Sequence, residues 1–587
     1  MLNPQFTGND AFDVLQGSVT NHFAAIESVL LKNEAVNGRY DLTTAASYAS
    51  NTPVETPGFS KVCISTNGSV IADLENSYIE ADLEFTLKYS STNVNGNAAL
   101  IPDPSNLNNP LANSTPLTKY FVGFKQSLDA LERYDIYCNS QLIYSQPFVG
   151  PESTILLAGI NDTIRENSPF VYTSYHNAST MDNNVCGVYI DLLNTAANAE
   201  FKVKIPVKIN IHQFLLLSPV HYLPSFCGRW EIQLYFGPKN LVFCPVNPLT
   251  YFNIERDAGV NNAFIDKYLN DVLRDVELDD DNGNKSNLKG FSSRFTQINT
   301  PMYMYTRAAD GNPTWVKNTF SCTKSNLSSC LMNITQFQLK YEIYQALMQR
   351  YIENPLIIPT NTLSYQRFAH SHTTGNQMEA TANLPVENID ALYVLIPENE
   401  NQQTCFYQPY LADVRMSMGE FGIRPARYMS TFNDGSTFNN RRFITYLLDS
   451  LNLEDSQISA MSKDFANSVL PQAIEYNGQN CAASSAVFAC RNKMNKQYDD
   501  SQFMIGIPCS HKGFQSGTVS SPNCNINFQF DAIKREFPKV KNGDTPTVKS
   551  FANGGIIVMF LTDAALMIQP SANSDQPLVR LSSKSIV

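Results

Sequence analysis

The heptapeptide WEIQLYF, residues 230–236, alternates apolar and mostly polar side chains. The hexapeptide NINFQF, residues 525–530, does the same near the other end of the chain. Each peptide follows an apolar segment and a loop rich in proline, serine and glycine, and each precedes another candidate strand; the preceding segments are 214–219 and 503–508, and the following ones are 334–344 and 555–568. This repeated order predicts two β domains of similar plan in one chain.

Strict alternation marks other strands of the first half. Residues 79–89 alternate apolar with mostly charged side chains, which is typical of a strand with one buried face. Residues 203–211 alternate in the same way, and Pro206 favours an edge strand because proline cannot donate a ladder hydrogen bond. Residues 135–144 predict two strands around a tight turn at 139–140.

The second half has its own strand candidates. They are found at 354–359, 391–396 and 414–418, and the apolar run 556–561 predicts a buried strand. In both halves the candidates are separated by long loops rich in asparagine, serine and proline, instead of by regular helices. This disfavours a parallel βαβ sheet, so the predicted fold class is mainly antiparallel β.

Helical spacing occurs locally. Residues 12–30 predict an N-terminal helix, and 263–276 and 443–469 predict helical insertions between strands. Residues 336–351 predict a strand that runs into a short helix and ends the first domain. The resulting division is an N-terminal helix and arm at 1–55, a first domain at 56–350 with a loop insertion at 245–330, a second domain at 351–572 with a helical insertion at 435–500, and a polar tail at 573–587.

The surface is predicted to be polar but weakly charged. Charged residues are 16% of the chain, against roughly 25% in an average soluble protein. This suits a surface covered by neighbouring copies, and it also suits an ordinary asparagine-rich β protein. The net charge of −12 argues against a protein that coats nucleic acid. The densest basic segment, Lys534 to Lys541, is predicted to be a solvated turn.

The first ten residues lack the features of a secretory signal, and no segment approaches the ~18 apolar residues of a membrane span. We therefore expect a soluble chain that is made in the cytoplasm. Twelve cysteines in 587 residues predict reduced, buried thiols. Two pairings within loops are alternatives in an oxidising environment: Cys322 with Cys330, and Cys481 with Cys490.

The sequence carries no phosphate-binding loop, no nucleophile elbow and no His-Glu-x-x-His pair. The acidic run 279–283 resembles a calcium loop, but its first and twelfth positions would be Leu278 and Lys289 instead of carboxylates. We interpret it as a solvated loop.

Other chemically interesting residues are few. His370 and His372 form one small group, and Cys509 and His511 form another; neither has the four ligands of a zinc site, so both are interpreted as loop or interface residues. Glu231 and Glu342, both placed on predicted strands, are weak candidates for the paired carboxylates of a glycosidase. The sequence thus predicts no catalytic, cofactor-binding or metal-binding residue, and no enzyme.

Two antiparallel β domains in tandem, with long loops and no catalytic set, resemble the double jelly-roll major capsid proteins of the adenovirus, tectivirus, virophage and polinton-like lineage. The asparagine-, tyrosine- and phenylalanine-rich style is most similar to the virophage and polinton-like branch. The resemblance covers roughly residues 56–572 and rests on the paired segments quoted above.

The resemblance implies two tandem eight-stranded jelly rolls in a subunit that homotrimerises into pseudo-hexameric capsomers of an icosahedral shell around double-stranded DNA. It also implies partners, namely further copies of the chain, penton proteins and minor capsid proteins, and a location in the virion. Sequence-specific nucleic-acid binding is not expected, and contact with the genome or an internal membrane would be indirect.

Two alternatives stay open. A carbohydrate-binding or glycan-cleaving β protein can also be built from jelly rolls, although only two tryptophans, Trp230 and Trp315, are present. A scaffold that forms transient lattices and then leaves the particle would share the fold.

Overall fold

The structure is a computed structural model. It describes residues 26–30, 58–64, 69–92, 100–101, 115–116, 119–158, 187–191, 200–245, 276–279, 285–288, 296–300, 302–307, 313–339, 341–368, 377–383, 389–397, 402–406, 411–418, 426–429, 504–508, 523–530, 555–571 and 577–582. Within these residues the chain is mainly β, every strand pair is antiparallel, and two α-helices occur. The predicted fold class is confirmed at this level.

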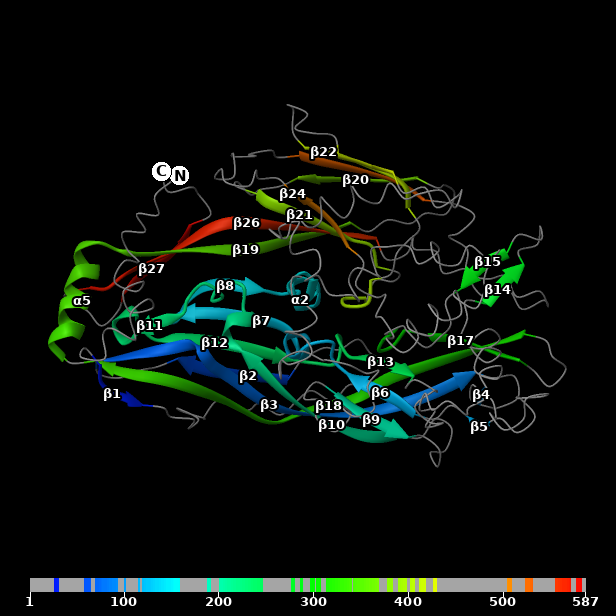
Figure 1. Ribbon diagram of the computed structural model, residues 1–587, viewed down its shortest axis with the longest axis horizontal. Helices are drawn as coiled ribbons and strands as arrows, with labels where there is room; N and C mark the ends of the chain where they lie inside the picture. Colours follow the sequence, from blue (N-terminus) through cyan, green and yellow to red (C-terminus); the bar gives the residue numbers. More distant parts are fainter. Residues whose placement is uncertain are drawn as a thin grey trace, which may run out of the picture.

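Two four-stranded arrays form the first half of the chain (Figure 1). Sheet 1 has the order β1 (Ile26–Leu30), β18 (Pro313–Leu339), β3 (Val70–Thr92), β10 (Glu200–Asn210). Sheet 2 has the order β2 (Gly58–Ile64), β12 (Trp230–Phe236), β7 (Leu131–Cys138), β8 (Gln141–Gln146). Two shorter strands extend sheet 1: β11 (Tyr222–Pro224) pairs with β3, and β17 (Met302–Arg307) pairs with β18.

The second half repeats this arrangement. Sheet 3 has the order β19 (Leu356–Phe368), β26 (Ile556–Gln569), β21 (Ile389–Leu395), β24 (Ile505–Pro508). Sheet 4 has the order β20 (Gln377–Asn383), β25 (Asn523–Phe530), β22 (Leu411–Met418), β23 (Ala426–Met429). A further strand, β27 (Leu578–Ser582), pairs with β26.

The strand order is the same in both halves. When the eight strands of each half are numbered along the chain, one sheet reads 1-8-3-6 and the other reads 2-7-4-5. This is the order of a jelly roll, in which a long antiparallel hairpin folds over into two sheets. The peptide WEIQLYF is the seventh strand of the first jelly roll, and NINFQF lies in the seventh strand of the second. The repeat predicted from these two peptides is therefore confirmed.

The remaining elements extend or connect the sheets. A third four-stranded sheet of the first half has the order β16 (Thr296–Gln297), β13 (Val242–Pro245), β6 (Lys119–Gly123), β9 (Gly187–Asp191). Two small hairpins join β4 (Leu100–Ile101) to β5 (Thr115–Pro116) and β14 (Val276–Asp279) to β15 (Lys285–Leu288). The helices are α2 (Val149–Ala158) and α5 (Tyr341–Glu353), with short 3-10 turns η1 (Ser127–Ala130), η3 (Ile211–Gln213) and η4 (Ser225–Cys227). Helix α5 follows β18 and leads into β19, as the 336–351 pattern predicted.

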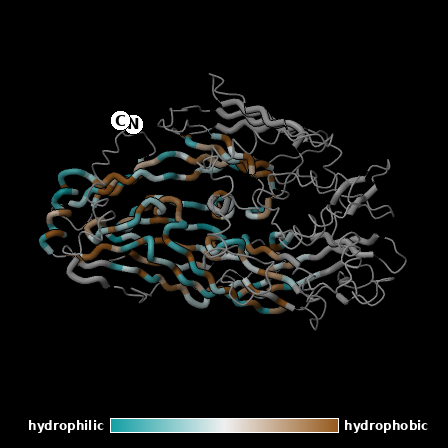
Figure 2. The backbone as a smooth tube through the Cα atoms, in the orientation of Figure 1, coloured by the Kyte–Doolittle hydropathy of each residue, from teal (hydrophilic) through white to brown (hydrophobic). Residues whose placement is uncertain are grey.

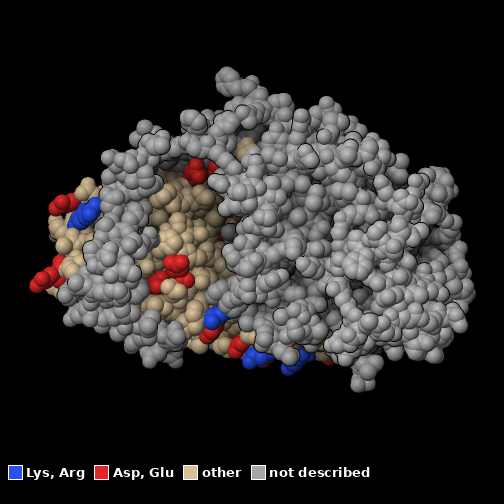
Figure 3. All heavy atoms as spheres, in the orientation of Figure 1, with Lys and Arg blue, Asp and Glu red and all other residues tan. Residues whose placement is uncertain are grey.

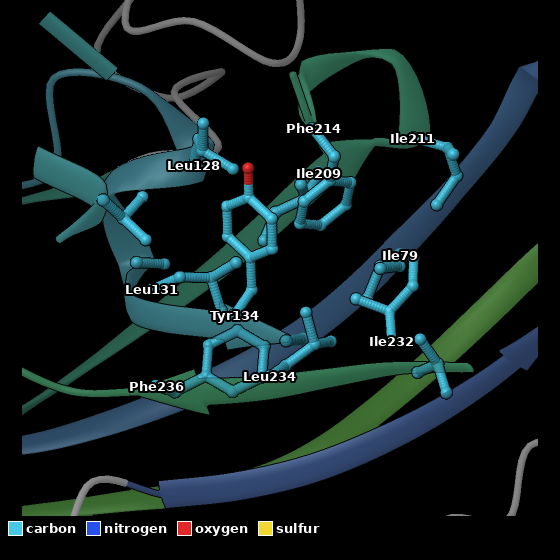
Figure 4. Close-up of a cluster of buried hydrophobic side chains, with 14 of the residues drawn as sticks. Ile79, Leu128, Leu131, Tyr134, Ile209, Ile211, Phe214, Ile232, Leu234 and Phe236 are labelled. Carbon is cyan, nitrogen blue, oxygen red and sulfur yellow. The ribbon is translucent and has the colours of Figure 1, made fainter. Parts of the chain in front are cut away.

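The core of the first jelly roll lies between sheets 1 and 2. Figure 4 shows Tyr134 of β7 among side chains from both sheets and from the turn that holds Phe214. The Tyr134 and Phe214 rings meet edge to face with their centroids 4.8 Å apart. Figure 2 shows hydrophobic and hydrophilic residues alternating along sheet 1. The alternation leaves one face in the core and the other toward solvent.

Two local predictions agree with the structure. Pro206 lies in β10, which is the last strand on the path through sheet 1. Asn139 and Ser140 join β7 to β8 and have positive φ values of 47° and 68°. Positive φ at both central residues twists a two-residue turn to match the two strands, and asparagine tolerates this conformation better than most residues.

Several predicted elements differ in the structure. Residues 26–30, placed in a helix by their spacing, form β1 because they pair with β18; residues 1–25 lie outside the described residues. Residues 214–219 form a turn instead of a strand, and Phe214, Leu216 and Leu217 fill the core from it. Strand β27 lies in the segment predicted to be a polar tail, and it forms because its backbone completes hydrogen bonds with β26.

The C-terminal part of the predicted loop insertion at 245–330 is strand instead of loop. Strand β17 and the start of β18 lie within it, and β18 begins at Pro313. The register of β18 against β3 shifts between Cys322 and Lys324, and again twice further along. At each bulge the buried and exposed sides of the strand change places. The apolar residues of β18 therefore do not keep one period of two, and the sequence pattern does not reveal the strand at its full length. Cys322 and Cys330 are free thiols on this one strand; eight residues of strand span ~26 Å, so their pairing is wrong.

One further prediction is only partly tested, and those between 435 and 500 are not tested. Val276, the end of the predicted helix at 263–276, is the first residue of β14, and the rest of that helix lies outside the described residues. The helical insertion at 435–500, with the helix at 443–469, and the pair Cys481 and Cys490 also lie outside them.

Candidate functional site

The two candidate carboxylates have separate environments. Glu231 is buried on β12 and forms an ion pair with Lys61 of the neighbouring strand β2, at 2.5 Å. Glu342 lies in the first turn of helix α5 and is exposed, so its predicted strand position is wrong. The helix begins there because the apolar residues Tyr344, Leu347 and Tyr351 then share one face that packs on the first jelly roll. Glu231 thus has a structural partner.

The other residues singled out by the sequence fall outside the described part of the chain, namely His370, His372, Cys509, His511 and the basic segment 534–541. Among the residues that the structure does describe, no group of three or more histidine, cysteine or acidic side chains could hold a metal ion. No helix in that part is long and apolar enough to cross a membrane.

Side chains from distant parts of the chain meet at the junction between the two jelly rolls. One face of sheet 3 packs on the first jelly roll, and its apolar side chains belong to the same core cluster as that domain; they are Leu356, Ile358, Leu566 and Ile568. In Figure 1 the four sheets appear as layers, with sheet 3 between sheet 2 and sheet 4. The two sandwiches therefore share buried surface, and the hydrophobic effect holds them together.

Polar contacts fix the register of this junction. The Thr360 hydroxyl donates to the Leu216 carbonyl at 3.0 Å. The Tyr144 hydroxyl accepts from the Leu363 N–H at 3.3 Å and donates to the Leu363 carbonyl at 3.4 Å. The Thr360 bond thus engages a backbone group of the first jelly roll, and the Tyr144 bonds engage both backbone groups of Leu363 on β19.

A short segment of the second jelly roll, residues 402–406, inserts into the first. Gln297 Oε1 accepts hydrogen bonds from the Gln403 and Thr404 N–H groups at 2.8 and 3.2 Å. Buried Lys125 donates to the Thr404 carbonyl at 3.5 Å. A Cβ atom at Gly150 would lie 2.4 Å from the Gln403 carbonyl oxygen, so only glycine fits there. We call residues 402–406 the plug.

The C-terminal strand also belongs to the junction. Val579 of β27 is buried in the core cluster of the first jelly roll, and Leu581 is partly buried against it. A Cβ atom at Gly228, which has a positive φ of 91°, would meet Pro577 at 2.7 Å. The strand that completes sheet 3 thus also packs on the first domain.

Two carboxyl groups lie buried beside these contacts. Glu152, on helix α2, accepts from the Tyr134 hydroxyl at 2.8 Å and from the Leu215 N–H at 3.4 Å. Burial raises the pKa of Glu152 to about 7, and the bonds from Tyr134, Gln146 and Leu215 only partly oppose this.

Asp129, in η1, is the second of these groups. It accepts from the Gln126 N–H at 3.3 Å. Burial raises the pKa of Asp129 to about 7, against the lowering effects of the Ser153 hydroxyl, the Lys125 ammonium and the Gln126 N–H. The junction therefore holds two acids that titrate near neutrality.

Sequence reasoning missed the junction because its members are far apart in the chain and of ordinary types. One signal was visible: the run 556–561 is apolar at every position, which is typical of a strand covered on both faces.

The structure is similar to several solved structures over nearly the whole chain, at low sequence identity. Over 95% of this chain and 90% of the other, the structure is similar to the mavirus major capsid protein, with a TM-score of 0.39 and 11% identity. It is similar to a chain of the Sputnik virophage structure over 96% of this chain and 90% of that one, with a TM-score of 0.38 and 9% identity. The Faustovirus major capsid protein matches over 96% of both chains, with a TM-score of 0.32 and 9% identity. No family model and no curated protein sequence matches the chain.

Proposed function

We propose that this chain is a major capsid protein without enzymatic activity. The observation that carries the proposal is the repeated strand order, 1-8-3-6 and 2-7-4-5, in two jelly rolls joined by a buried junction. The plug and the shared core join the two sandwiches into one block with two similar halves. A block of this kind is suited to tiling a surface.

Symmetry explains how such a block would be used. Three copies around a threefold axis present six similar walls, so the trimer approximates a hexagon and packs closely with its neighbours. The proposed assembly is a homotrimeric capsomer that tiles an icosahedral shell around double-stranded DNA, completed by penton and minor capsid proteins. The site of action would then be the virion, after synthesis in the host cytoplasm.

The outer face of sheet 1 is one surface available for contacts between copies. Figure 3 shows basic and acidic side chains gathered along the lower edge, where Figure 1 places sheet 1. Lys204 lies 3.6 Å from Asp82, and Lys208 lies 3.8 Å from Glu80. Because these charges are already paired within the chain, we expect contacts between copies to be made mainly by loops and aromatic side chains, and to survive high salt.

Light scattering of the purified chain, with electron microscopy of the same sample, tests the proposal. We expect a stable species of three times 65.5 kDa with a hexagonal outline, and the same mass in about 1 M salt. A monomer that does not assemble at any concentration would contradict the proposal and favour a glycan-binding role, which a glycan array would then examine. Dissociation by salt alone would contradict only the proposed nature of the contacts.

A further inference from the structure

Side chains link each buried carboxyl group of the junction to a backbone group of the second jelly roll. Glu152 accepts from the Tyr134 hydroxyl, and Tyr144, which lies beside Tyr134 and accepts from Gln146, bonds both backbone groups of Leu363. Asp129 lies near Lys125, which bonds the Thr404 carbonyl in the plug. Each carboxyl group is therefore connected to one contact between the two jelly rolls.

Both carboxyl groups are incompletely bonded. Asp129 Oδ1 and Glu152 Oε2 are buried and have no hydrogen-bond partner among the described residues. A neutral carboxyl group tolerates such an oxygen at modest cost, whereas a carboxylate spreads a full charge over it. The geometry therefore suits the protonated form of each group.

We propose that the junction is a proton-dependent lock, held closed while Asp129 and Glu152 carry protons and loosened when they ionise. Ionised Glu152 attracts the Tyr144 hydroxyl proton, which the closed junction donates to the Leu363 carbonyl. Ionised Asp129 attracts the Lys125 ammonium away from the Thr404 carbonyl. Loss of the two protons thus weakens the contact at β19 and the contact at the plug together, whether or not the chain assembles with other copies.

The sign of the pH dependence follows from linkage. In an open junction the carboxyl groups are hydrated and ionise near pH 4. In the closed junction the pKa of each is about 7. Opening therefore releases protons between about pH 4 and about pH 7, so the closed state loses stability as pH rises through this window and changes little above it.

Hydrogen exchange of the intact protein, followed by mass spectrometry at pH 6 and pH 8, measures this directly. Once the intrinsic exchange rate at each pH has been divided out, peptides covering β19 and the plug should lose protection by about tenfold for each carboxyl group. A peptide covering β18, which pairs with β1, β3 and β17 in sheet 1, is the internal reference and should keep its protection.

A double variant, Glu152→Gln with Asp129→Asn, should show no difference in junction protection between pH 6 and pH 8. The control Glu231→Gln alters a buried carboxylate outside the junction and should keep the response of the unmodified chain. The proposal is overturned if junction and reference peptides of the unmodified chain respond alike, a result that does not depend on how the variants fold. It is also overturned if the double variant keeps the full response.

Discussion

Strands β3 and β21 are both the third strand of a jelly roll, and each lies between the eighth and the sixth strand of its sheet. In β3, inward residues such as Leu83 are buried, while Glu80 is exposed and Glu84 is partly exposed. In β21 all seven residues are buried. The same topology therefore occurs in a sheet with one face toward solvent and in a sheet covered on both faces. The side chains on the outer face are mostly charged in the first case and mostly apolar in the second.

The difference has a structural cause. Sheet 3 is covered by sheet 4 on one side and by the first jelly roll on the other, where Ile358 and Leu566 join the core of that domain. The outer face of sheet 1 carries paired charges instead. The two jelly rolls are thus alike in strand order but unequal in their surroundings.

A charge on the face of sheet 3 that packs on the first jelly roll should destabilise the junction between the two jelly rolls. Ile358→Asp places an unpaired carboxylate in the shared core, and we expect a loss of about 4 kcal/mol or more in the free energy of unfolding. Chemical denaturation followed by fluorescence measures it. The matched control is Thr86→Asp on the partly exposed outer face of sheet 1, which should change stability by about 0.5 kcal/mol or less. Equal losses at the two positions would contradict the comparison.

A methyl group at the plug should have an intermediate effect. Gly150 lies near the start of helix α2, where alanine would ordinarily stabilise the helix by about 1 kcal/mol. Because its Cβ would meet the Gln403 carbonyl, we expect Gly150→Ala to destabilise the chain by about 1–3 kcal/mol instead. Thermal unfolding measures the sign, and a raised melting temperature would show that the plug does not occupy this place.

Removal of a surface charge should have the smallest effect. Lys204 and Asp82 are both substantially exposed, with 57% and 38% of their side-chain surface accessible. Exposed ion pairs contribute little, so Lys204→Ala should cost about 0.5 kcal/mol or less in chemical denaturation. A loss as large as that expected at Gly150 would mean that the outer face of sheet 1 is itself covered, for example by another copy.

The sequence predicted the elements in which local pattern and tertiary environment agree. The alternation of β3 and β10 and the two-residue turn at Asn139 and Ser140 could be predicted because each depends on neighbours in the chain. The repeat of the seventh strand revealed the duplication. Elements fixed by distant partners were missed: β1 exists because β18 pairs with it, and β18 changes register three times along β3.

The junction was beyond sequence reasoning for the same reason. Gln297 and the plug are more than a hundred positions apart, as are Tyr144 and Leu363. Nothing in the vicinity of Glu152 or Asp129 in the sequence distinguishes them from surface acids. Their burial depends on the fold of both halves, and the raised pKa values follow from that burial.

An electron cryo-microscopy map of the assembled protein tests the central claim most directly, because it shows strand order and packing together. We expect both halves to read 1-8-3-6 and 2-7-4-5, with the Thr360 face of sheet 3 against Leu216 and the plug against Gln297. A map in which the two sandwiches are separate and the Thr360 face meets solvent would contradict the account.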